Sequence, residues 1–420
     1  MEKLLINGKK KLSGEIKVQG SKNSTLPIIA AAVMCDGEIV LHNCPNLTDV
    51  SAAVNILGHL GCKITRENDS LIIDSTTVCV SEIPEKLMLE MRSSIVFLGA
   101  LLARTGKAVL STPGGCEIGV RPIDLHLKAM RELGVEVTEE NGKLLCEAKD
   151  GIRGTDLSLA FPSVGATENI MLAASLGNGR TTLNNAAREP EIKNLADFLT
   201  SCGARIYFAG EGRIIIDGVK KLHGCEFEVI SDRIVASTYM ACCAVTGGEL
   251  DILNCPVNDI SPVLPLFHTC GCRITADENT LHIKAPKKLR SPGTVRTMPY
   301  PGFPTDFQAP AMAMATVADG TSIFIETIFE SRYKHVPELK KMGANISVEG
   351  SVAVVQGASK LTSANVYAGD LRGGAALVVG ALASEGETSI FNIKHIDRGY
   401  ENIEDNLHSL GAEIKREIQV

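Results

Sequence analysis

The stretch Leu60-Gly61-Cys62-Lys63-Ile64-Thr65 recurs with substitutions along the chain and decides the fold. Closely related versions occupy residues 133–138, 270–275 and 410–415. In each version a glycine follows one predicted helix and precedes a predicted strand, a position where the left-handed backbone of glycine favours helix termination. Six such glycines recur at intervals of about 70 residues, so six copies of one supersecondary unit are expected to bury a shared interior: Gly61, Gly134, Gly203, Gly271, Gly343 and Gly411.

Each copy has the same order of predicted elements. An apolar helix is followed by a strand rich in β-branched residues, an amphipathic second helix that ends at the glycine, and an alternating strand. The first helices are apolar on nearly every face and are therefore expected to be buried; they are predicted over residues 26–34, 94–103, 167–175, 234–245, 307–317 and 374–383. The first strands are predicted over residues 38–41, 108–110, 181–183, 249–253, 322–325 and 388–391. The sequence thus predicts an α/β fold in which sheets enclose helices, with two groups of three copies that meet near residue 229.

Composition favours a large soluble enzyme of the cytoplasm. The 420 residues are 45% hydrophobic and 22% charged, enough to build a sizeable core. A net charge of -7 argues against nucleic acid or an anionic membrane as the main partner. The apolar runs are shorter than a membrane span, and the first residues do not resemble a signal peptide. The 13 cysteines lack metal-ligand or disulfide-framework spacing, which predicts reduced thiols and no metal or cofactor.

Several basic residues fall at or near predicted helix starts, where a cation is locally unfavourable. Unpaired backbone N–H groups give a helix start a partial positive charge. A bound anion offsets this charge and the charge of the basic side chain. If the helix starts of each half face one way, these side chains converge on an anion site. Pairing with nearby acids such as Glu90, Glu189, Asp232 or Asp370 is the alternative for any one of them. The cations are Lys22, Arg92, Arg233 and Arg372 at first helices, and Arg121, Arg188, Arg332 and Arg398 before second helices.

A glycine-rich loop with a cysteine interrupts the second copy and has no counterpart in the other five. Pro113-Gly114-Gly115-Cys116 leads, after a short apolar stretch, to Arg121. A nearby cation and a helix start both favour the thiolate, the form that acts as a nucleophile. Alternatively, the cysteine is only a small apolar residue that packs in the core. The loop and its cationic setting favour a catalytic role for Cys116.

A proline-rich segment over residues 298–306 ends in an acid. Prolines hold the backbone extended, and the next helix is predicted to begin at Asp306 or Phe307, so that the Asp306 carboxylate is either an N-cap or a base in a cleft. Asp370 and Arg372 repeat this arrangement of an acid beside a cation in the sixth copy.

Nine segments, in order along essentially the whole chain, resemble the UDP-N-acetylglucosamine 1-carboxyvinyltransferase family of enolpyruvyl transferases. Any one match is weak, but so many in sequence order are specific. The segments cover residues 20–27, 91–94, 114–126, 162–169, 187–191, 303–306, 326–332, 370–372 and 397–401.

This resemblance implies transfer of the enolpyruvyl group of phosphoenolpyruvate to the 3'-hydroxyl of UDP-N-acetylglucosamine, with release of phosphate. That reaction is the first committed step of peptidoglycan synthesis, and so bears on cell shape and division. The implied fold has two inside-out α/β domains, each of three βαβαββ-like units with buried helices. Residues 22–229 form one domain, residues 1–21 and 230–420 form the other, and the active site lies in the cleft between them. The family also implies a cytoplasmic monomer that binds neither nucleic acid nor membrane.

The resemblance also assigns roles to individual residues. Cys116 is implied to be the acid that protonates C3 of phosphoenolpyruvate and the target of the epoxide fosfomycin, Asp306 is implied to be the base, and Asp370 to support them. Forked guanidinium groups suit the phosphate and carboxylate of phosphoenolpyruvate, and its implied ligands are Lys22, which is also catalytic, Arg92, Arg121, Arg332, Arg372 and Arg398. The implied ligands of UDP-N-acetylglucosamine are Asn23, Arg92, Arg121, Pro122, Asp124, Leu125, Ser163, Val164, Gly165, Asp306 and Ile328.

Three positions depart from the family pattern without removing a principal chemical group. Phe161 replaces a lysine found in some members, Ser331 replaces a common asparagine and Ser21 a frequent alanine. Two other functions remain as alternatives: 5-enolpyruvylshikimate-3-phosphate synthase, which shares the fold but lacks the cysteine loop, and a paralogue that binds nucleotide sugars without turnover. Retention of Cys116 and Asp306 together argues against the second, because a binding protein needs neither an acid nor a base.

Overall fold

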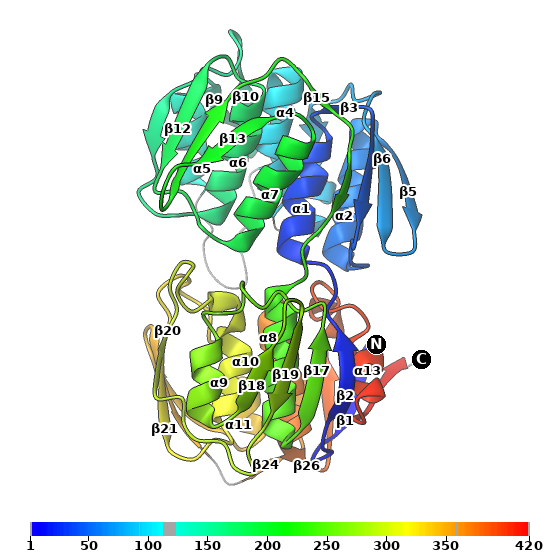
Figure 1. The fold of residues 1–420 in the computed structure, drawn as a ribbon, viewed down its shortest axis with the longest axis vertical. Coiled ribbons are helices and arrows are strands. Elements are labelled where there is room, and N and C mark those ends of the chain that lie inside the picture. Colours follow the sequence, from blue (N-terminus) through cyan, green and yellow to red (C-terminus); the bar gives the residue numbers. More distant parts are fainter. Residues whose placement is uncertain (1, 92, 112–122, 358–359, 419–420) are drawn as a thin grey trace. The chain divides into compact units, whose positions relative to one another are not determined.

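The structure is a computed structural model that describes residues 2–91, 93–111, 123–357 and 360–418. Within these ranges the chain forms two compact units (Figure 1). The first unit contains the described residues between 20 and 230, and the second unit contains residues 2–19 and the described residues between 231 and 418.

The first unit contains three copies of the repeat. The first copy contains α1 (Lys22–Ala32), β3 (Cys35–Asp36), β4 (Glu38–His42), α2 (Thr48–Leu60), β5 (Lys63–Glu67) and β6 (Ser70–Asp74). The second contains β7 (Glu82–Ile83), α3 (Glu85–Glu90), η1 (Ser94–Val96), α4 (Phe97–Thr105), β8 (Lys107–Ser111), α5 (Asp124–Glu132), β9 (Glu136–Glu140) and β10 (Lys143–Glu147). The third contains β11 (Asp156–Ser158), α6 (Val164–Ser175), β12 (Arg180–Asn184), α7 (Pro190–Ser201), β13 (Arg205–Phe208) and β14 (Arg213–Asp217), and is followed by β15 (Leu222–His223) and β16 (Glu226–Glu228).

The second unit repeats this order. Its first copy contains β2 (Ser13–Lys17), α8 (Arg233–Thr246), β17 (Glu249–Leu253), α9 (Leu264–Cys270), β18 (Arg273–Ala276) and β19 (Thr280–Lys284). The next contains β20 (Thr294–Arg296), α10 (Thr305–Ala315), β21 (Thr321–Ile325), α11 (Val336–Lys341), β22 (Asn345–Glu349) and β23 (Val352–Gln356). The last contains β24 (Leu361–Thr362), β25 (Asn365–Tyr367), α12 (Leu371–Ala383), β26 (Ser384–Glu385), β27 (Glu387–Phe391), η2 (Ile393–His395), α13 (Ile403–Ser409) and β28 (Glu413–Ile418), and is completed by β1 (Glu2–Asn7).

Every copy builds the same four-stranded sheet. The strand before the first helix pairs in parallel with the strand after it, which pairs antiparallel with a closing hairpin, as in the order β11-β12-β14-β13. Strands are exchanged where the chain passes between units: β2 precedes α1 but pairs with β17, and β16 precedes α8 but pairs with β4. The N-terminal strand β1 fills the place of a missing hairpin strand in the last sheet, between β27 and β28.

The repeated glycines end the second helices as predicted. Gly61, Gly134, Gly203, Gly271, Gly343 and Gly411 all have positive φ, from 89° to 103°. This backbone region is one that glycine adopts without a Cβ penalty. The six-copy pattern is therefore confirmed.

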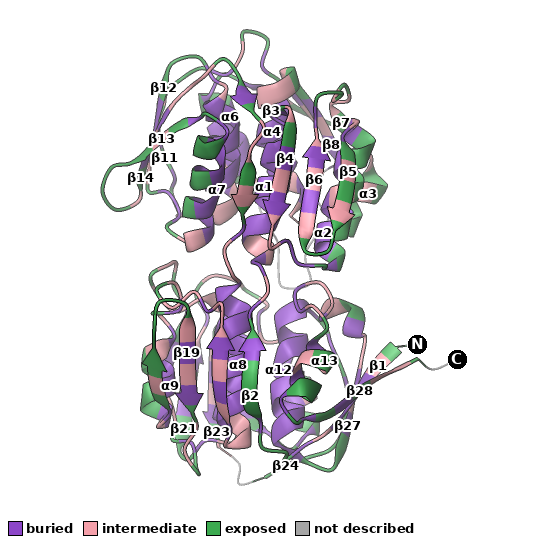
Figure 2. Ribbon diagram, turned by 45° about the vertical axis from the view of Figure 1, so that its right-hand side comes forward, coloured by how far each residue is buried: buried purple, intermediate pink, exposed green. Residues whose placement is uncertain are grey.

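The first helices are buried within each unit, as Figure 2 shows for α1, α6, α8 and α12. In α12, for example, each residue from Leu371 to Ala383 is buried. Five of the six start one to four residues earlier than predicted, whereas α4 of the second copy begins at Phe97, after η1. Polar caps sustain four of the early first turns, which break the apolar pattern. The caps are Ser21, Ser163, Asp232 and Asp370, whose side chains accept hydrogen bonds from backbone N–H groups of the first turn.

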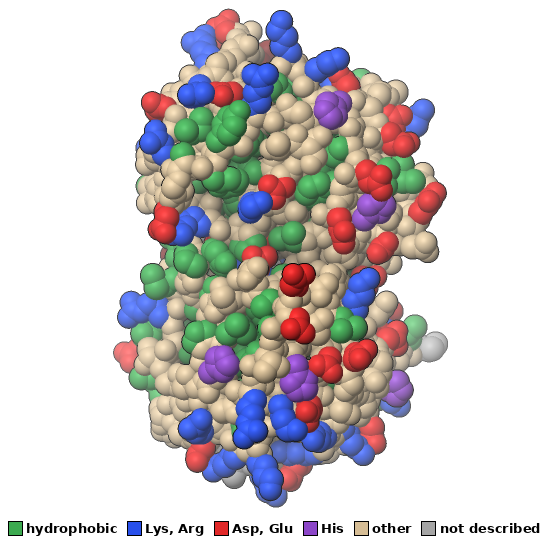
Figure 3. All heavy atoms as spheres, viewed as in Figure 1, with side chains coloured by type: hydrophobic (Ala, Val, Ile, Leu, Met, Phe, Trp, Pro, Cys, Tyr) green, Lys and Arg blue, Asp and Glu red, His purple; other side chains and the backbone are tan. Residues whose placement is uncertain are grey.

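The surface carries mixed charge. In the face drawn in Figure 3, acidic and basic side chains are interspersed over both units, and ion pairs such as Lys284–Glu249 and Arg180–Asp217 bridge neighbouring strands. Among the described residues no helix combines the length and apolar character needed to cross a bilayer.

Candidate active site

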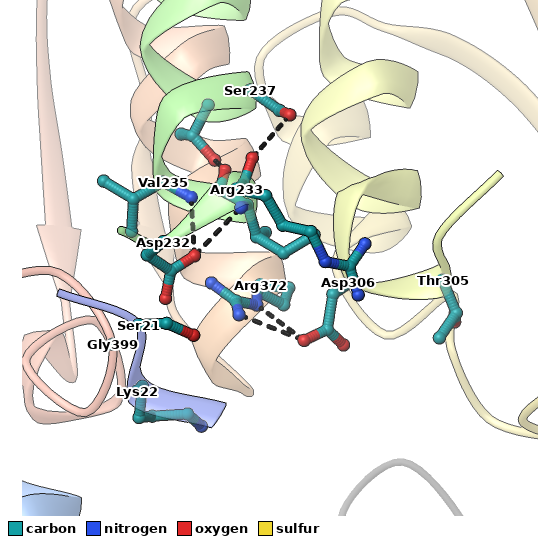
Figure 4. Close-up of polar contacts among 12 residues, drawn as sticks. Ser21, Lys22, Asp232, Arg233, Val235, Ser237, Thr305, Asp306, Arg372 and Gly399 are labelled. Atoms are coloured by element: carbon teal, nitrogen blue, oxygen red, sulfur yellow. Dashed lines mark hydrogen bonds and ion pairs between the residues drawn. The ribbon is translucent and has the colours of Figure 1, made fainter. Parts of the chain in front are cut away.

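An acid held between two arginines occupies the start of α10 in the second unit. The Asp306 carboxylate accepts a hydrogen bond from Arg332 Nη2 through Oδ1 at 2.9 Å. Its Oδ2 accepts from Arg372 Nη2 and Nε at 3.0 and 3.3 Å (Figure 4). The two predicted ligands and the predicted base are thus brought together from two copies of the repeat, because Asp306 and Arg332 belong to one copy and Arg372 belongs to the next.

The three side chains differ in exposure, and the difference bears on chemistry. Arg332 and Arg372 are 4% and 3% exposed, whereas Asp306 is 28% exposed. Burial lowers the pKa of Arg372, but the carboxylate of Asp306 and the other neighbours outweigh it, so that the net pKa is raised. The Arg372 guanidinium therefore stays charged, and the most accessible member of the cluster is a carboxylate, a group that is able to accept a proton.

The N-cap interpretation of Asp306 is wrong. Helix α10 begins at Thr305, its cap residue is Pro304, and no side chain caps it. Asp306 lies in the first turn, where its carboxylate turns to the arginines. Because α10 starts earlier than the apolar pattern indicates, the acid is displaced from the cap position.

The neighbouring helix α12 begins at a true acidic cap. Asp370 Oδ1 accepts hydrogen bonds from the backbone N–H groups of Arg372 and Gly373, at 3.1 and 2.9 Å. Arg372 Nη1 also donates to the hydroxyl of Tyr400, which contacts Thr238. Asp370 thus supports the cluster indirectly, because it fixes the backbone from which Arg372 reaches Asp306.

A second buried carboxylate organises the segment beside Asp306. Glu326 accepts hydrogen bonds from the hydroxyls of Thr297 and Thr305, at 2.9 and 3.0 Å, and from the backbone N–H groups of Ile328 and Phe329, at 2.8 and 3.2 Å. It therefore connects the start of α10 to the turn that carries Ile328, a predicted sugar ligand.

A buried imidazole adjoins this cluster, and one more predicted ligand lies further along the chain. Arg398 is partly buried and falls between η2 and α13 in the sequence. His335 is buried and adjoins Arg332 and Asp370 electrostatically; burial lowers the pKa of His335 to about 4, so the imidazole is neutral at pH 7.

The first unit places Lys22 and Asn23 in the first turn of α1, directly after the Ser21 cap. Lys22 Nζ lies 3.4 Å from Asp49 Oδ2 of α2, and both side chains are largely buried. The predicted cation at this helix start is thus offset by an acid from the second helix of the same copy.

A neutral network connects the helix starts that carry the other predicted sugar ligands of the first unit. The buried side chain of Asn169 accepts from the backbone N–H of Gly99 at 2.6 Å and contacts His126 Nδ1 at 2.9 Å. Its Nδ2 also donates to the carbonyls of Ile95 and Gly165. Burial lowers the pKa of His126 to about 4, so the ring is neutral and Nδ1 accepts from the amide. The network ties together the starts of α4, α5 and α6.

The starts of α5 and α6 carry five predicted ligands of the nucleotide sugar. Asp124 and Leu125 form the first turn of α5, the former exposed and the latter partly buried. Ser163 caps α6, and Val164 and Gly165 begin it. A Cβ on Gly165 would lie 3.0 Å from the His126 ring, so glycine lets the two helix starts approach. Unpaired N–H groups at such a start suit a phosphate.

The remaining predicted site residues Arg92, Cys116, Arg121 and Pro122 lie outside the described residues. Two other cations near helix starts have different partners: Arg188 pairs with the exposed Glu211 at 3.0 Å, and the Arg233 guanidinium stacks on the Tyr300 ring. Among the described residues no cluster of three or more His, Cys, Asp or Glu side chains is arranged to hold a metal ion.

Glu326, Asn169 and Asp49 were not predicted to support the site. Glu326 and Asn169 do fall inside segments that resemble the family, which was the available signal. No signal in the sequence marked Asp49, because an acid in the first turn of a helix is common.

Comparisons with known proteins agree with this geometry. A sequence model of the EPSP synthase (3-phosphoshikimate 1-carboxyvinyltransferase) family matches residues 6–407. The UDP-N-acetylglucosamine 1-carboxyvinyltransferase 2 of Caldanaerobacter subterraneus subsp. tengcongensis is 49% identical over 99% of this chain and 100% of its own length. The UDP-N-acetylglucosamine 1-carboxyvinyltransferase of Acinetobacter baylyi is 45% identical with the same coverage.

Solved structures share the fold. The enolpyruvyl transferase NikO from Streptomyces tendae aligns with a TM-score of 0.90 at 24% identity, over 100% of this chain and 99% of that one. EPSP synthase from Acinetobacter baumannii aligns with a TM-score of 0.77 at 17% identity over both full chains. The fold is therefore the two-domain inside-out α/β fold of these enzymes, and the chain belongs to the UDP-N-acetylglucosamine 1-carboxyvinyltransferase family of enolpyruvyl transferases.

Proposed function

We propose that this protein transfers the enolpyruvyl group of phosphoenolpyruvate to the 3'-hydroxyl of UDP-N-acetylglucosamine and releases phosphate. The observation that carries the proposal is its 49% identity, over the full length of both chains, to a relative of that name. The cluster of Asp306, Arg332 and Arg372 supports it, because it offers an accessible carboxylate beside permanent positive charge.

The proposed reaction is an addition followed by an elimination. Cys116 protonates C3 of phosphoenolpyruvate, which makes C2 electrophilic, and the sugar hydroxyl adds to C2 while Asp306 accepts its proton. The tetrahedral ketal then loses phosphate from C2 and a proton from C3, which restores the double bond. The same thiol forms the covalent phospholactoyl adduct when it adds to C2 itself.

Charge complementarity assigns the donor substrate. Phosphoenolpyruvate carries a phosphate and a carboxylate on three carbons, and we assign its binding to Lys22, Arg121 and Arg398 together with Arg92, Arg332 and Arg372. We assign the nucleotide sugar to Asn23, Arg92, Arg121, Pro122, Asp124, Leu125, residues 163–165, Asp306 and Ile328. The α6 start, where Ser163 and Gly165 lie, offers backbone N–H groups to the diphosphate.

Both proposed domains contribute to this one reaction. Lys22 and Cys116 come from residues 22–229, and Asp306, Asp370 and Arg372 come from the domain of residues 1–21 and 230–420. We place the reaction in the cytoplasm of a bacterium, as the first committed step of peptidoglycan synthesis and so of cell-shape maintenance and division, and we assign it to a monomer.

A phosphate-release assay tests the acceptor. Purified protein is incubated with phosphoenolpyruvate and either UDP-N-acetylglucosamine, shikimate 3-phosphate or no acceptor. Stoichiometric phosphate is expected with UDP-N-acetylglucosamine alone. Turnover with shikimate 3-phosphate would identify the alternative synthase, and binding of the nucleotide sugar without phosphate release would identify a non-catalytic paralogue.

Cys116 is tested separately with the epoxide phosphonate fosfomycin. We expect the intact mass to rise by one fosfomycin when UDP-N-acetylglucosamine is present, and the Cys116→Ser variant to keep its mass and to lose most of its activity. An unmodified wild-type protein would remove Cys116 from the proposed mechanism.

A further inference from the structure

Two cysteines that the proposed reaction does not use face each other in the first unit. Cys202 is the cap residue at the end of α7, and Cys225 immediately precedes β16. Their Sγ atoms lie 3.3 Å apart. A disulfide bond is about 2.05 Å long, so the bond requires a small movement of the two side chains.

The backbone holds both cysteines in place. The carbonyl of Cys202 accepts a hydrogen bond from His223 N at 2.9 Å, and the carbonyl of Cys225 accepts one from Val40 N at 2.9 Å. Between them, Gly224 approaches the backbone of Glu38 so closely that an added Cβ would lie 1.9 Å from its carbonyl oxygen. The segment from β15 to β16 is thus fixed against β3 and β4, which holds Cys225 beside Cys202.

The two thiols differ in access, which sets the order of reaction. Cys202 is buried, whereas Cys225 is partly exposed. A third thiol, Cys35, also contacts Cys202. The Cys225 contact lowers the pKa of Cys202, but the Cys35 contact and burial outweigh it; the Cys202 contact and burial raise the pKa of Cys225. Both groups therefore rest as thiols at neutral pH, which agrees with their reduced form in the structure.

We propose that Cys202 and Cys225 form a reversible disulfide bond with each other by exchange with low-molecular-weight disulfides such as oxidised glutathione. The Cys225 thiolate attacks the small disulfide, its S–S bond breaks, and one small thiol leaves with the proton lost by Cys225. The Cys202 thiolate then attacks the mixed disulfide at Cys225 and displaces the second small thiol. Two protein thiols are oxidised, and one small disulfide is reduced to two thiols.

The bond would join the end of the third copy to the segment that closes the unit on the first copy. Residues 202–225 would form a covalent loop, and loop closure restricts the unfolded chain. The oxidised protein is therefore expected to unfold at a higher urea concentration than the reduced protein.

Tryptic mapping separates the three thiols cleanly. Cleavage places Cys202 on residues 194–205, Cys225 on residues 222–233 and Cys35 on residues 23–63. The folded full-length protein is incubated with oxidised glutathione, alkylated, and digested without reductant for mass spectrometry. We expect peptides 194–205 and 222–233 to be linked, with a mass two hydrogens below their sum, and to separate after reduction.

Variants test the order of attack and the effect on stability. In Cys202→Ala we expect glutathione to remain on Cys225, and in Cys225→Ser we expect no linked peptide and no rise of the urea midpoint after oxidation. Glutathione held on wild-type Cys225 without a bridge, a bridge from residues 23–63 to residues 194–205, or alkylated thiols throughout would each overturn the proposal. None of these readouts depends on enolpyruvyl transfer, so the site stands or falls independently of the proposed function.

Discussion

The two units present their candidate site residues through opposite kinds of polar cluster. In the second unit, Asp306, Arg332 and Arg372 form a charged cluster whose acid is its accessible member. In the first unit, Asn169 and His126 form a neutral cluster that touches three helix starts. A charged cluster stabilises or accepts charge, whereas a neutral one fixes distances. The difference supports the proposal that Asp306 of the second unit accepts the proton of the sugar hydroxyl, and that the neutral cluster of the first unit sets the shape of the nucleotide site.

The largest expected effect comes from neutralising the acid of the charged cluster. Asp306→Asn keeps the size of the side chain but removes the proton acceptor, and loss of a general base lowers rates by about 10²- to 10⁴-fold. Phosphate release with saturating substrates measures kcat. The matched change in the neutral cluster, His126→Asn, is expected to keep kcat within a few-fold, and an equal loss in both variants would erase the contrast between the clusters.

Truncation of Asn169, the centre of the neutral cluster, is expected to lower the stability of the protein instead of its kcat. Asn169→Ala strands the Gly99 N–H and the His126 ring without partners inside the core, and each unsatisfied buried group costs about 1–3 kcal/mol. Urea denaturation should show a loss of roughly 2–6 kcal/mol in the free energy of unfolding. The folded fraction of this variant should retain its kcat. A variant of unchanged stability with a large fall in kcat would show that Asn169 acts in the reaction and not in holding the structure.

Low pH is expected to reduce the free energy of unfolding through His126 of the neutral cluster. The pKa of this ring is lowered to about 4 in the folded chain by burial, against a usual 6.5. As pH falls below 6.5 the unfolded chain binds a proton that the folded chain does not, so the free energy of unfolding falls until about pH 4 and then levels off. Between pH 7 and pH 5 the loss from this one group is about 2 kcal/mol.

His126→Asn keeps an acceptor for Asn169 but removes the titration. Its free energy of unfolding should therefore fall less than that of the wild type over the same pH range, by about 2 kcal/mol. Parallel pH profiles for the two proteins would show that His126 is not the group that titrates.

The smallest effect is expected from removing a hydrogen bond that supports the charged cluster. Thr305→Val removes the hydroxyl that donates to Glu326 at 3.0 Å and frees the start of α10 beside Asp306. One such hydrogen bond contributes about 1 kcal/mol, or roughly fivefold in kcat, with KM for the sugar little changed. Thr305→Ser restores the hydroxyl and should restore kcat; failure of this rescue would assign the effect to packing.

Architecture was predictable from the sequence because it repeats. Six glycines in register, each with positive φ in the structure, and six apolar helices carry the fold in local patterns. The first turns of α1, α8 and α12 were missed because Lys22, Arg233 and Arg372 interrupt the apolar pattern there, while the caps Ser21, Asp232 and Asp370 sustain the turns.

The contacts within the site were less accessible from the sequence. Asp306 meets Arg372 across 66 residues, and Lys22 meets Asp49 across 27. No local pattern encodes such pairs, because they follow from how the copies pack. Resemblance to the family named the residues, and the structure supplied the partners of Asp306, Lys22 and Glu326.

The addition and elimination that this account assigns to Cys116 and Asp306 are tested most directly by carrying out the reaction in D₂O. Protonation of C3 by a solvent-exchanged thiol creates a CH₂D group, and loss of one of its hydrogens returns a methylene that retains deuterium in most molecules. Mass spectrometry of the product is expected to show enolpyruvyl-UDP-N-acetylglucosamine with deuterium in that methylene. Product without deuterium would contradict the addition step, and no product at all would contradict the proposed function.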